Sequence, residues 1–147
     1  DILGYDIAIS AVIWAGKRNP RDQQSIFKLT KGYFKPISIF SLPISQIPFY
    51  WVDNHNSNET VSLVYKLDTD LLINAGTPNI LKAPLLTAPR IGVLNSHPGL
   101  LPDYRGCSCV EWAIYNDDAI GATCHFMNQA IDEGPIVLSR EIQIAKG

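Results

Sequence analysis

The sequence IGVLNSHPGLLPDYRG, at positions 91–106, decides the fold class of this chain. Its first four residues form an apolar run that predicts a buried strand, and a proline and a glycine at positions 98 and 99 end that strand. Just before this end, Asn95 and His97 are two residues apart, so their side chains point to one face of an extended chain. Ligands of open parallel sheets bind just past the carboxyl ends of strands. The stretch therefore predicts an amide and an imidazole side by side where such folds bind their ligands.

Predicted strands alternate with predicted helices along the whole chain. Apolar runs predict strands at 7–14, 37–40, 70–75, 91–97, 120–127 and 136–144. Helical patterns and capping residues predict helices at 20–31, 57–65, 83–87 and 108–116. The proline-containing segment 41–58 is predicted to be mostly loop. This alternation is typical of an α/β domain, so the expected fold is a Rossmann-like, mostly parallel sheet flanked by helices.

Composition indicates one globular domain, 1–147, in a reducing compartment. The 147 residues are 46% hydrophobic and 18% charged, which favours a folded core over disorder. The three cysteines, Cys107, Cys109 and Cys124, are an odd count that does not suit a disulfide framework, so a cytoplasmic protein is expected. A net charge of -2 predicts no nucleic-acid partner, and the absence of a long apolar run predicts no membrane span.

Two further segments join the opening stretch in a recognisable order. GATCHF at 121–126 predicts a strand, and AIDEGPIV at 130–137 predicts a tight loop leading into the last strand. Together with NSHPGLLPDYRG, these segments resemble the folate-dependent formyltransferase family, whose motifs run N-x-H-P, then T-x-H, then D-x-G. The resemblance covers residues 71–137 well and the first half of the chain only loosely. It is specific because three linked motifs agree.

The resemblance implies a reaction and three catalytic residues. A formyl group would pass from the cosubstrate 10-formyltetrahydrofolate to a primary amine. The carbonyl oxygen becomes negative in the transition state and needs preorganised donors, which would be Asn95 and His97. The attacking nitrogen must lose a proton, and Asp132 is the expected acceptor. Asp132 would also keep the His97 imidazole cationic near neutral pH.

Other family positions imply supporting and cofactor-binding residues. Thr123 and His125 fall on T-x-H and would support the aspartate loop, although His125 is equally consistent with a satisfied core histidine. Arg105 would hold its own loop rather than touch substrate. Gly76 would let the backbone approach the pterin closely. The residues expected to bind the cofactor, mainly through backbone groups, are Gly76, Ile80, Leu81, Gln129, Ala130 and Ile131.

Several alternatives remain open at the level of sequence. The protein could be a hydrolase that passes the formyl group to water, a catalytically idle binding domain, or a nucleotide-binding α/β module. A nucleotide-binding module should have a Gly-rich turn after its first strand, which residues 15–18 do not supply. Cys107 and Cys109 have no assigned role. They are too closely spaced for a zinc site with His97 or His125, so no metal is expected.

The expected acceptor is a small-molecule amine. A tRNA acceptor calls for a basic surface and a second domain, and a glycinamide ribonucleotide acceptor calls for a phosphate-binding turn near the start. Neither set of features is visible in the sequence. An amino sugar on a nucleotide carrier remains by elimination.

The start of the chain predicts an incomplete sheet. Domains of the family begin with a strand and helix that precede the strand matching 7–14. In doubly wound sheets the first strand lies in the middle. Without it, strands 7–14 and 70–75 would each have an unpaired edge. We therefore expect a fragment of a longer protein, or a sheet completed by a homo-oligomer or by another complementing strand.

Overall fold

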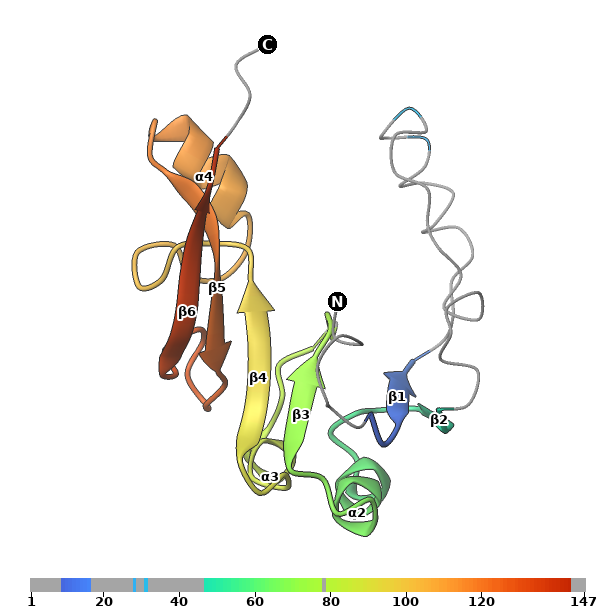
Figure 1. Cartoon of the computed structure of the whole chain (residues 1–147). Coiled ribbons are helices and arrows are strands. Elements are labelled where there is room, and N and C mark those ends of the chain that lie inside the picture. The colour runs from blue at the N-terminus through green and yellow to red at the C-terminus, as the bar shows by residue number, and fades with distance from the viewer. Residues whose placement is uncertain (1–8, 17–27, 29–30, 32–46, 78, 144–147) are drawn as a thin grey trace. The chain divides into compact units, whose positions relative to one another are not determined.

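The computed structural model describes residues 9–16, 28, 31, 47–77 and 79–143 (Figure 1). The chain divides into two compact units, Asp1–His55 and Asn56–Gly147. In the first unit, β1 (Val12–Ala15) pairs in parallel with β2 (Phe49–Val52). The predicted helix at 20–31, apart from Lys28 and Lys31, and the predicted strand at 37–40 lie outside the described residues.

The predicted loop at 41–58 is wrong where β2 forms. Pro48 lowers the strand signal of this region, but it stands just before the strand, a position that proline tolerates because no ladder hydrogen bond needs its nitrogen. Its carbonyl accepts a hydrogen bond of 2.9 Å from the Val12 N–H. The aromatic residues of FYWV then favour the pleated strand, and the Trp51 ring lies 5.9 Å from that of Trp14.

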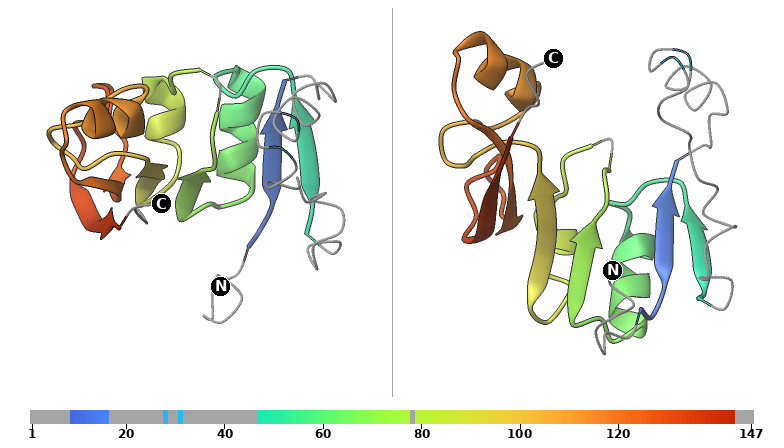
Figure 2. Two further views of the ribbon diagram at one scale, coloured as in Figure 1. Left: turned by 90° about the horizontal axis from the view of Figure 1, so that it is seen from above. Right: turned by 45° about the horizontal axis from the view of Figure 1, so that its top comes forward.

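The second unit is built on a four-stranded sheet in the order β3-β4-β5-β6. Figures 1 and 2 show β3, β4 and β5 side by side, with β6 at the edge. The strands are β3 (Leu71–Asn74), β4 (Gly92–His97), β5 (Ile120–Phe126) and β6 (Ile136–Ile142).

The expectation of a mostly parallel sheet is corrected by these pairings. β3 and β4 are parallel, but β4 and β5 are antiparallel, and so are β5 and β6. The loop 127–135 between β5 and β6 is too short for the crossover that a parallel connection needs, so the chain turns back on itself. The sheet of the second unit is therefore mixed.

Three helices accompany this sheet among the described residues. They are α2 (Asn58–Lys66), α3 (Ala83–Leu86) and α4 (Cys109–Tyr115), and each lies where a helix was predicted. Ser57 caps α2, and its hydroxyl accepts the Thr60 N–H at 3.2 Å. None of the helices in the described part of the chain is long and apolar enough to span a membrane.

The core of the second unit gathers around β4. Val93 of β4 is completely buried, and Val64 of α2 nearly so. The other buried apolar residues of this unit are Leu81, Leu85, Leu86, Ala88, Leu101, Cys109 and Ala113. β4 thus runs through the core, and it carries the two polar residues singled out by the sequence, Asn95 and His97.

The strand that the family resemblance implies before residues 7–14 stays a prediction.

Candidate active site

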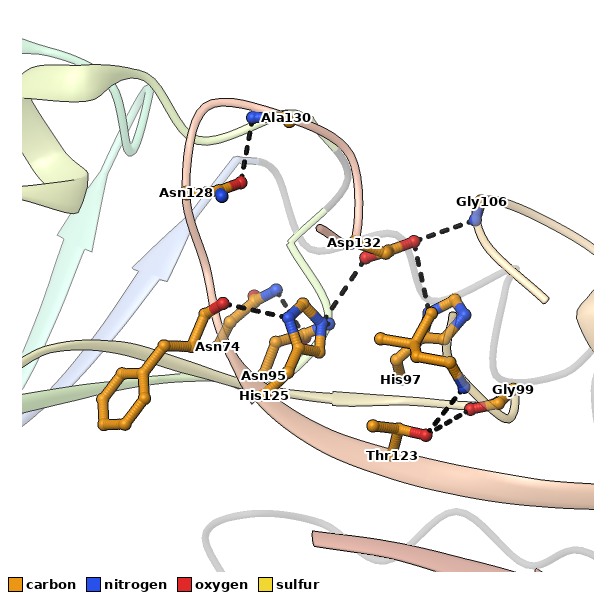
Figure 3. A network of polar contacts seen from close by, with 12 residues as sticks. Asn74, Asn95, His97, Gly99, Gly106, Thr123, His125, Asn128, Ala130 and Asp132 are labelled. Atoms are coloured by element: carbon orange, nitrogen blue, oxygen red, sulfur yellow. Dashed lines mark hydrogen bonds and ion pairs between the residues drawn. The ribbon is translucent and has the colours of Figure 1, made fainter. Parts of the chain in front are cut away.

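The site begins at the end of β4, where Asn95 and His97 lie on one face as predicted (Figure 3). The antiparallel register places Asn95 opposite His125 and His97 opposite Thr123 on β5. Directly opposed residues of an antiparallel pair share a face of the sheet. The polar residues of two motifs are thus brought together by strand pairing alone.

Asp132 reaches this face from the loop 127–135. Gly134 allows the loop to fold tightly, since a Cβ at this position would lie 1.7 Å from the Phe126 carbonyl oxygen. Asp132 itself adopts a left-handed backbone with φ of 53°. One of its carboxylate oxygens, Oδ2, accepts the Gly106 N–H at 2.8 Å and lies 3.4 Å from His97 Nδ1. The other, Oδ1, lies 3.5 Å from His125 Nε2.

The surroundings of His97 suit a cationic imidazole. The residue is only 3% exposed. Its Nε2 lies 2.8 Å from the carbonyl oxygen of Tyr104, and its Nδ1 faces the Asp132 carboxylate. Both neighbours can only accept hydrogen bonds, so an imidazolium, which donates from both nitrogens, satisfies them. The contact of Nε2 with Tyr104 is the shorter of the two, so a hydrogen bond from His97 to a substrate would come from Nδ1, in exchange for its 3.4 Å contact with Asp132.

His125 is in the opposite situation. Its Nδ1 lies 3.0 Å from the carbonyl oxygen of Phe126, and its Nε2 lies 3.2 Å from Asn95 Nδ2. The first neighbour accepts and the second donates, so a neutral ring with its proton on Nδ1 satisfies both. His125 is buried, and it contacts Asn95 and Asp132 directly. The two histidines on either side of Asp132 thus have hydrogen-bond neighbours that favour different protonation states.

Two hydrogen bonds and an ion pair hold the loop 98–106 against the rest of the site. The buried Thr123 hydroxyl donates to the Gly99 carbonyl at 2.8 Å and accepts the Leu101 N–H at 3.1 Å. Arg105 forms a 2.9 Å ion pair with Glu133, the residue after Asp132. Both ion-pair side chains are about half exposed, so the pair contributes little stability, but it connects the two loops that enclose Asp132.

The six residues expected to bind the cofactor lie in two loops with different exposure. Gly76, Ile80, Gln129, Ala130 and Ile131 are exposed, whereas Leu81 is buried in the core at 3% exposure.

Backbone geometry refines the expectations for these loops. The Ala130 N–H already donates to Asn128 Oδ1 at 3.0 Å, so this donor is engaged within its own loop. Gly76 has φ of 94° and open space around it, so its positive φ rather than a close contact accounts for a glycine here.

Sequence reasoning missed the role of Asn74. This residue ends β3 and is paired in register with Asn95 of β4. Its Nδ2 donates to Asn95 Oδ1 at 3.0 Å. The available signal was that two neighbouring parallel strands each carry an asparagine near their carboxyl end.

Sequence reasoning also left Cys109 without a role, and the structure places its Sγ 3.3 Å from His97 Nε2. Burial, with a smaller effect of the Asp132 charge, raises the pKa of the Cys109 thiol. It therefore stays a neutral thiol at neutral pH and is a poor nucleophile. Within the described ranges, no group of three or more His, Cys, Asp or Glu side chains has the geometry to hold a metal ion.

Comparison with known proteins identifies relatives of this chain. The family model described as formyl transferase matches residues 22–147. Methionyl-tRNA formyltransferase of Thermotoga maritima is 34% identical over 100 residues, which make up 67% of this chain and 32% of that protein. This chain thus spans about a third of the length of that relative.

Solved structures share the fold. Phosphoribosylglycinamide formyltransferase from Bacillus halodurans superposes with a TM-score of 0.63 at 22% identity, covering 92% of this chain and 81% of that chain. The formyltransferase PseJ from Anoxybacillus kamchatkensis, in complex with UDP-4,6-dideoxy-4-formamido-L-AltNAc and tetrahydrofolate, gives 0.56 at 14% identity, with coverages of 91% and 61%. At these identities the likeness concerns the fold.

Proposed function

Because this chain belongs to the formyl transferase family, we propose that its protein transfers a formyl group from 10-formyltetrahydrofolate to a primary amine of a small molecule. The observation that carries this proposal is the grouping of Asn95, His97 and Asp132 at the end of β4. An amide donor, a cationic donor and a carboxylate base meet there in one partly buried site. Acyl transfer to an amine needs these three groups.

The contacts support a separate task for each residue. The amine nitrogen attacks the formyl carbon, and negative charge develops on the formyl oxygen. Asn95 Nδ2 and His97 Nδ1 are the donors that we assign to this charge. Tyr104 engages Nε2 of His97, so the Nδ1 proton would pass from its 3.4 Å contact with Asp132 to the developing oxyanion. Asp132 takes a proton from the attacking nitrogen. The bond between the formyl carbon and N10 of the folate then breaks, and N10 receives the proton that Asp132 took, which restores the Asp132 carboxylate.

The folate cosubstrate fits the exposed backbone of the two loops beside the site. The segment 73–81 covers the end of β3 and the loop after it, and the loop 129–134 carries Asp132, so a pterin between them would bring N10 toward Asn95. The bound tetrahydrofolate of PseJ supports this choice of cosubstrate. Calorimetry with a stable reduced folate should show binding. Tight binding of an adenine or nicotinamide dinucleotide with no folate affinity would favour a plain nucleotide-binding module.

An amino sugar on a nucleotide carrier is the acceptor we propose. The formamido sugar nucleotide bound to PseJ supports this class. The net charge of -2 does not favour binding of a large polyanion. The relative from Thermotoga maritima acts, by its name, on methionyl-tRNA, so this acceptor belongs in the same assay.

The test is turnover by the full-length natural protein that contains this chain. Release of tetrahydrofolate from 10-formyltetrahydrofolate would be followed with an amino sugar nucleotide, with glycinamide ribonucleotide, with methionyl-tRNA and without any amine. We expect release that depends on the amino sugar, with a formamide product detected by mass spectrometry. Release without any amine would identify a hydrolase, and no release under any condition would refute the transferase.

A further inference from the structure

We propose that Asn74 is a positioning residue that sets the direction of the Asn95 amide and the tautomer of His125. Its effect on catalysis rests on the proposed function, because Asn95 is the amide donor of that mechanism. Its effect on hydrogen-bond direction can be measured without any reaction. Asn74 is half-buried at the end of β3, beside Asn95 in the parallel register.

A continuous chain of hydrogen bonds runs from the cofactor loop to the end of β5. The Thr77 N–H donates to Asn74 Oδ1 at 3.1 Å. Asn74 Nδ2 then lies 3.0 Å from Asn95 Oδ1, and Asn95 Nδ2 lies 3.2 Å from His125 Nε2. The chain ends where His125 Nδ1 lies 3.0 Å from the Phe126 carbonyl oxygen.

The two ends of this chain dictate the direction of every bond in it. The backbone N–H of Thr77 can only donate, so the Asn74 oxygen faces Thr77 and its NH2 group faces Asn95. That NH2 group requires the oxygen of Asn95, which turns the Asn95 NH2 group toward His125. The backbone carbonyl of Phe126 can only accept, so the ring proton of His125 sits on Nδ1. Donor and acceptor roles agree from both ends.

This direction leaves the site ready for the proposed chemistry. Asn95 donates one amide hydrogen to His125 Nε2. Its second amide hydrogen has no acceptor among the described residues, so it can donate to a substrate. With Nε2 of His125 unprotonated, Asp132 Oδ1 receives no proton donor from this ring and stays available as a base. If the side-chain amide of Asn95 flipped by 180°, its oxygen would stand beside the formyl group in place of the NH2 donor. Asn74 prevents this inversion.

The contact with Thr77 also connects the amide to the cofactor loop. Thr77 follows Gly76, whose left-handed backbone shapes the turn after β3. The bond from Thr77 to Asn74 therefore forms only when this turn has its observed shape. Asn74 thus couples the shape of the proposed folate loop to the direction of the catalytic amide.

Asn74→Asp is the sharpest test because it changes one atom of the side chain. The carboxylate still accepts the Thr77 N–H, but an oxygen now faces Asn95 Oδ1, so the Asn95 amide should invert. At neutral pH we expect kcat to fall by about tenfold to a hundredfold, since a transition-state donor is misplaced. Protonation of the new carboxyl group restores a donor toward Asn95. The ratio of variant to wild-type kcat should therefore rise as the pH falls.

Asn74→Ala separates positioning from packing, because it loses the same donor but has no group to protonate. Its kcat ratio to wild type should stay low and independent of pH. The matched control is Asn58→Asp at the exposed start of α2, which adds the same charge away from the site and should keep wild-type kcat.

Heteronuclear NMR of the imidazole nitrogens provides a readout that needs no turnover. The wild type should show His125 protonated on Nδ1 alone. In Asn74→Asp at neutral pH the inverted Asn95 oxygen should bring a proton to Nε2 as well, because the Phe126 carbonyl still requires a donor at Nδ1. If both proteins show the expected protonation of His125 but the wild type transfers no formyl group, the positioning role holds and the proposed function fails. A proton on Nε2 of His125 in the wild type, or a kcat of Asn74→Asp equal to wild type in an active enzyme, would overturn the proposal.

Discussion

Asp132→Asn tests the centre of the proposed mechanism with the least structural change. The amide oxygen of asparagine can still accept the Gly106 N–H, which now bonds at 2.8 Å. Its NH2 group would then point at His125 Nε2, an unprotonated nitrogen 3.5 Å from the present Oδ1. The substitution therefore keeps two neighbours satisfied. What it removes is the negative charge beside His97 and the base that accepts the proton of the amine.

The expected loss of stability follows from these contacts. Removing one partner of a buried ion pair costs about 3–5 kcal/mol. The His97 contact is long at 3.4 Å, with side-chain exposures of 4% and 13%. In the variant, His97 can also release its proton, so no unpaired charge has to stay buried. We therefore expect a loss of about 2 kcal/mol in the free energy of unfolding, below the range for a fully buried pair. The protein should remain folded, because such a loss is smaller than the stability of a typical domain.

The expected loss of activity is much larger. A general base contributes about a hundredfold or more to a rate, so kcat should fall by at least that factor while the KM for folate changes little. Urea denaturation gives the stability, and tetrahydrofolate release by the full-length protein gives kcat. Asp103→Asn, which removes the same charge from an exposed position in the loop 98–106, is the matched control. A kcat of Asp132→Asn within threefold of that control would refute Asp132 as the proton acceptor.

Three further outcomes are expected. Gly134→Ala should lower both stability and activity, because its Cβ would lie 1.7 Å from a backbone oxygen and the aspartate loop would have to move; a melting temperature equal to wild type would contradict this. Asn95→Ala and His97→Ala should each reduce kcat by about a hundredfold or more, and the double variant by less than the product of the two, because both donors serve one oxyanion; strictly multiplicative losses would indicate independent roles. Iodoacetamide at neutral pH should modify the exposed Cys107 well before Cys109, since burial raises the pKa of the Cys109 thiol and lowers its thiolate fraction; rapid labelling of Cys109, measured by peptide mass spectrometry, would count against that environment.

Local features of the fold could be predicted because their causes are local. Ser57 caps α2 through the N–H of Thr60, only three residues away. Asn95 and His97 share a face because alternation is a property of any strand. The predicted loop at 41–58 was the exception. Its prolines and polar residues argued against a strand, and β2 forms because it pairs with β1. That pairing joins segments that are far apart in the sequence.

The sequence by itself determined the order of the elements from α2 to β6, the family and the polar residues at the end of β4. Only the tertiary structure decided that the sheet of the second unit is mixed, that His125 lies between Asn95 and Asp132, and that Asn74 directs the Asn95 amide. The physical reason is distance along the chain. Asn74 and Asn95 are 21 residues apart, and Asn95 and His125 are 30 apart, so their hydrogen bonds exist only after the strands have paired. The direction of those bonds then depends on a backbone donor at one end and a backbone acceptor at the other.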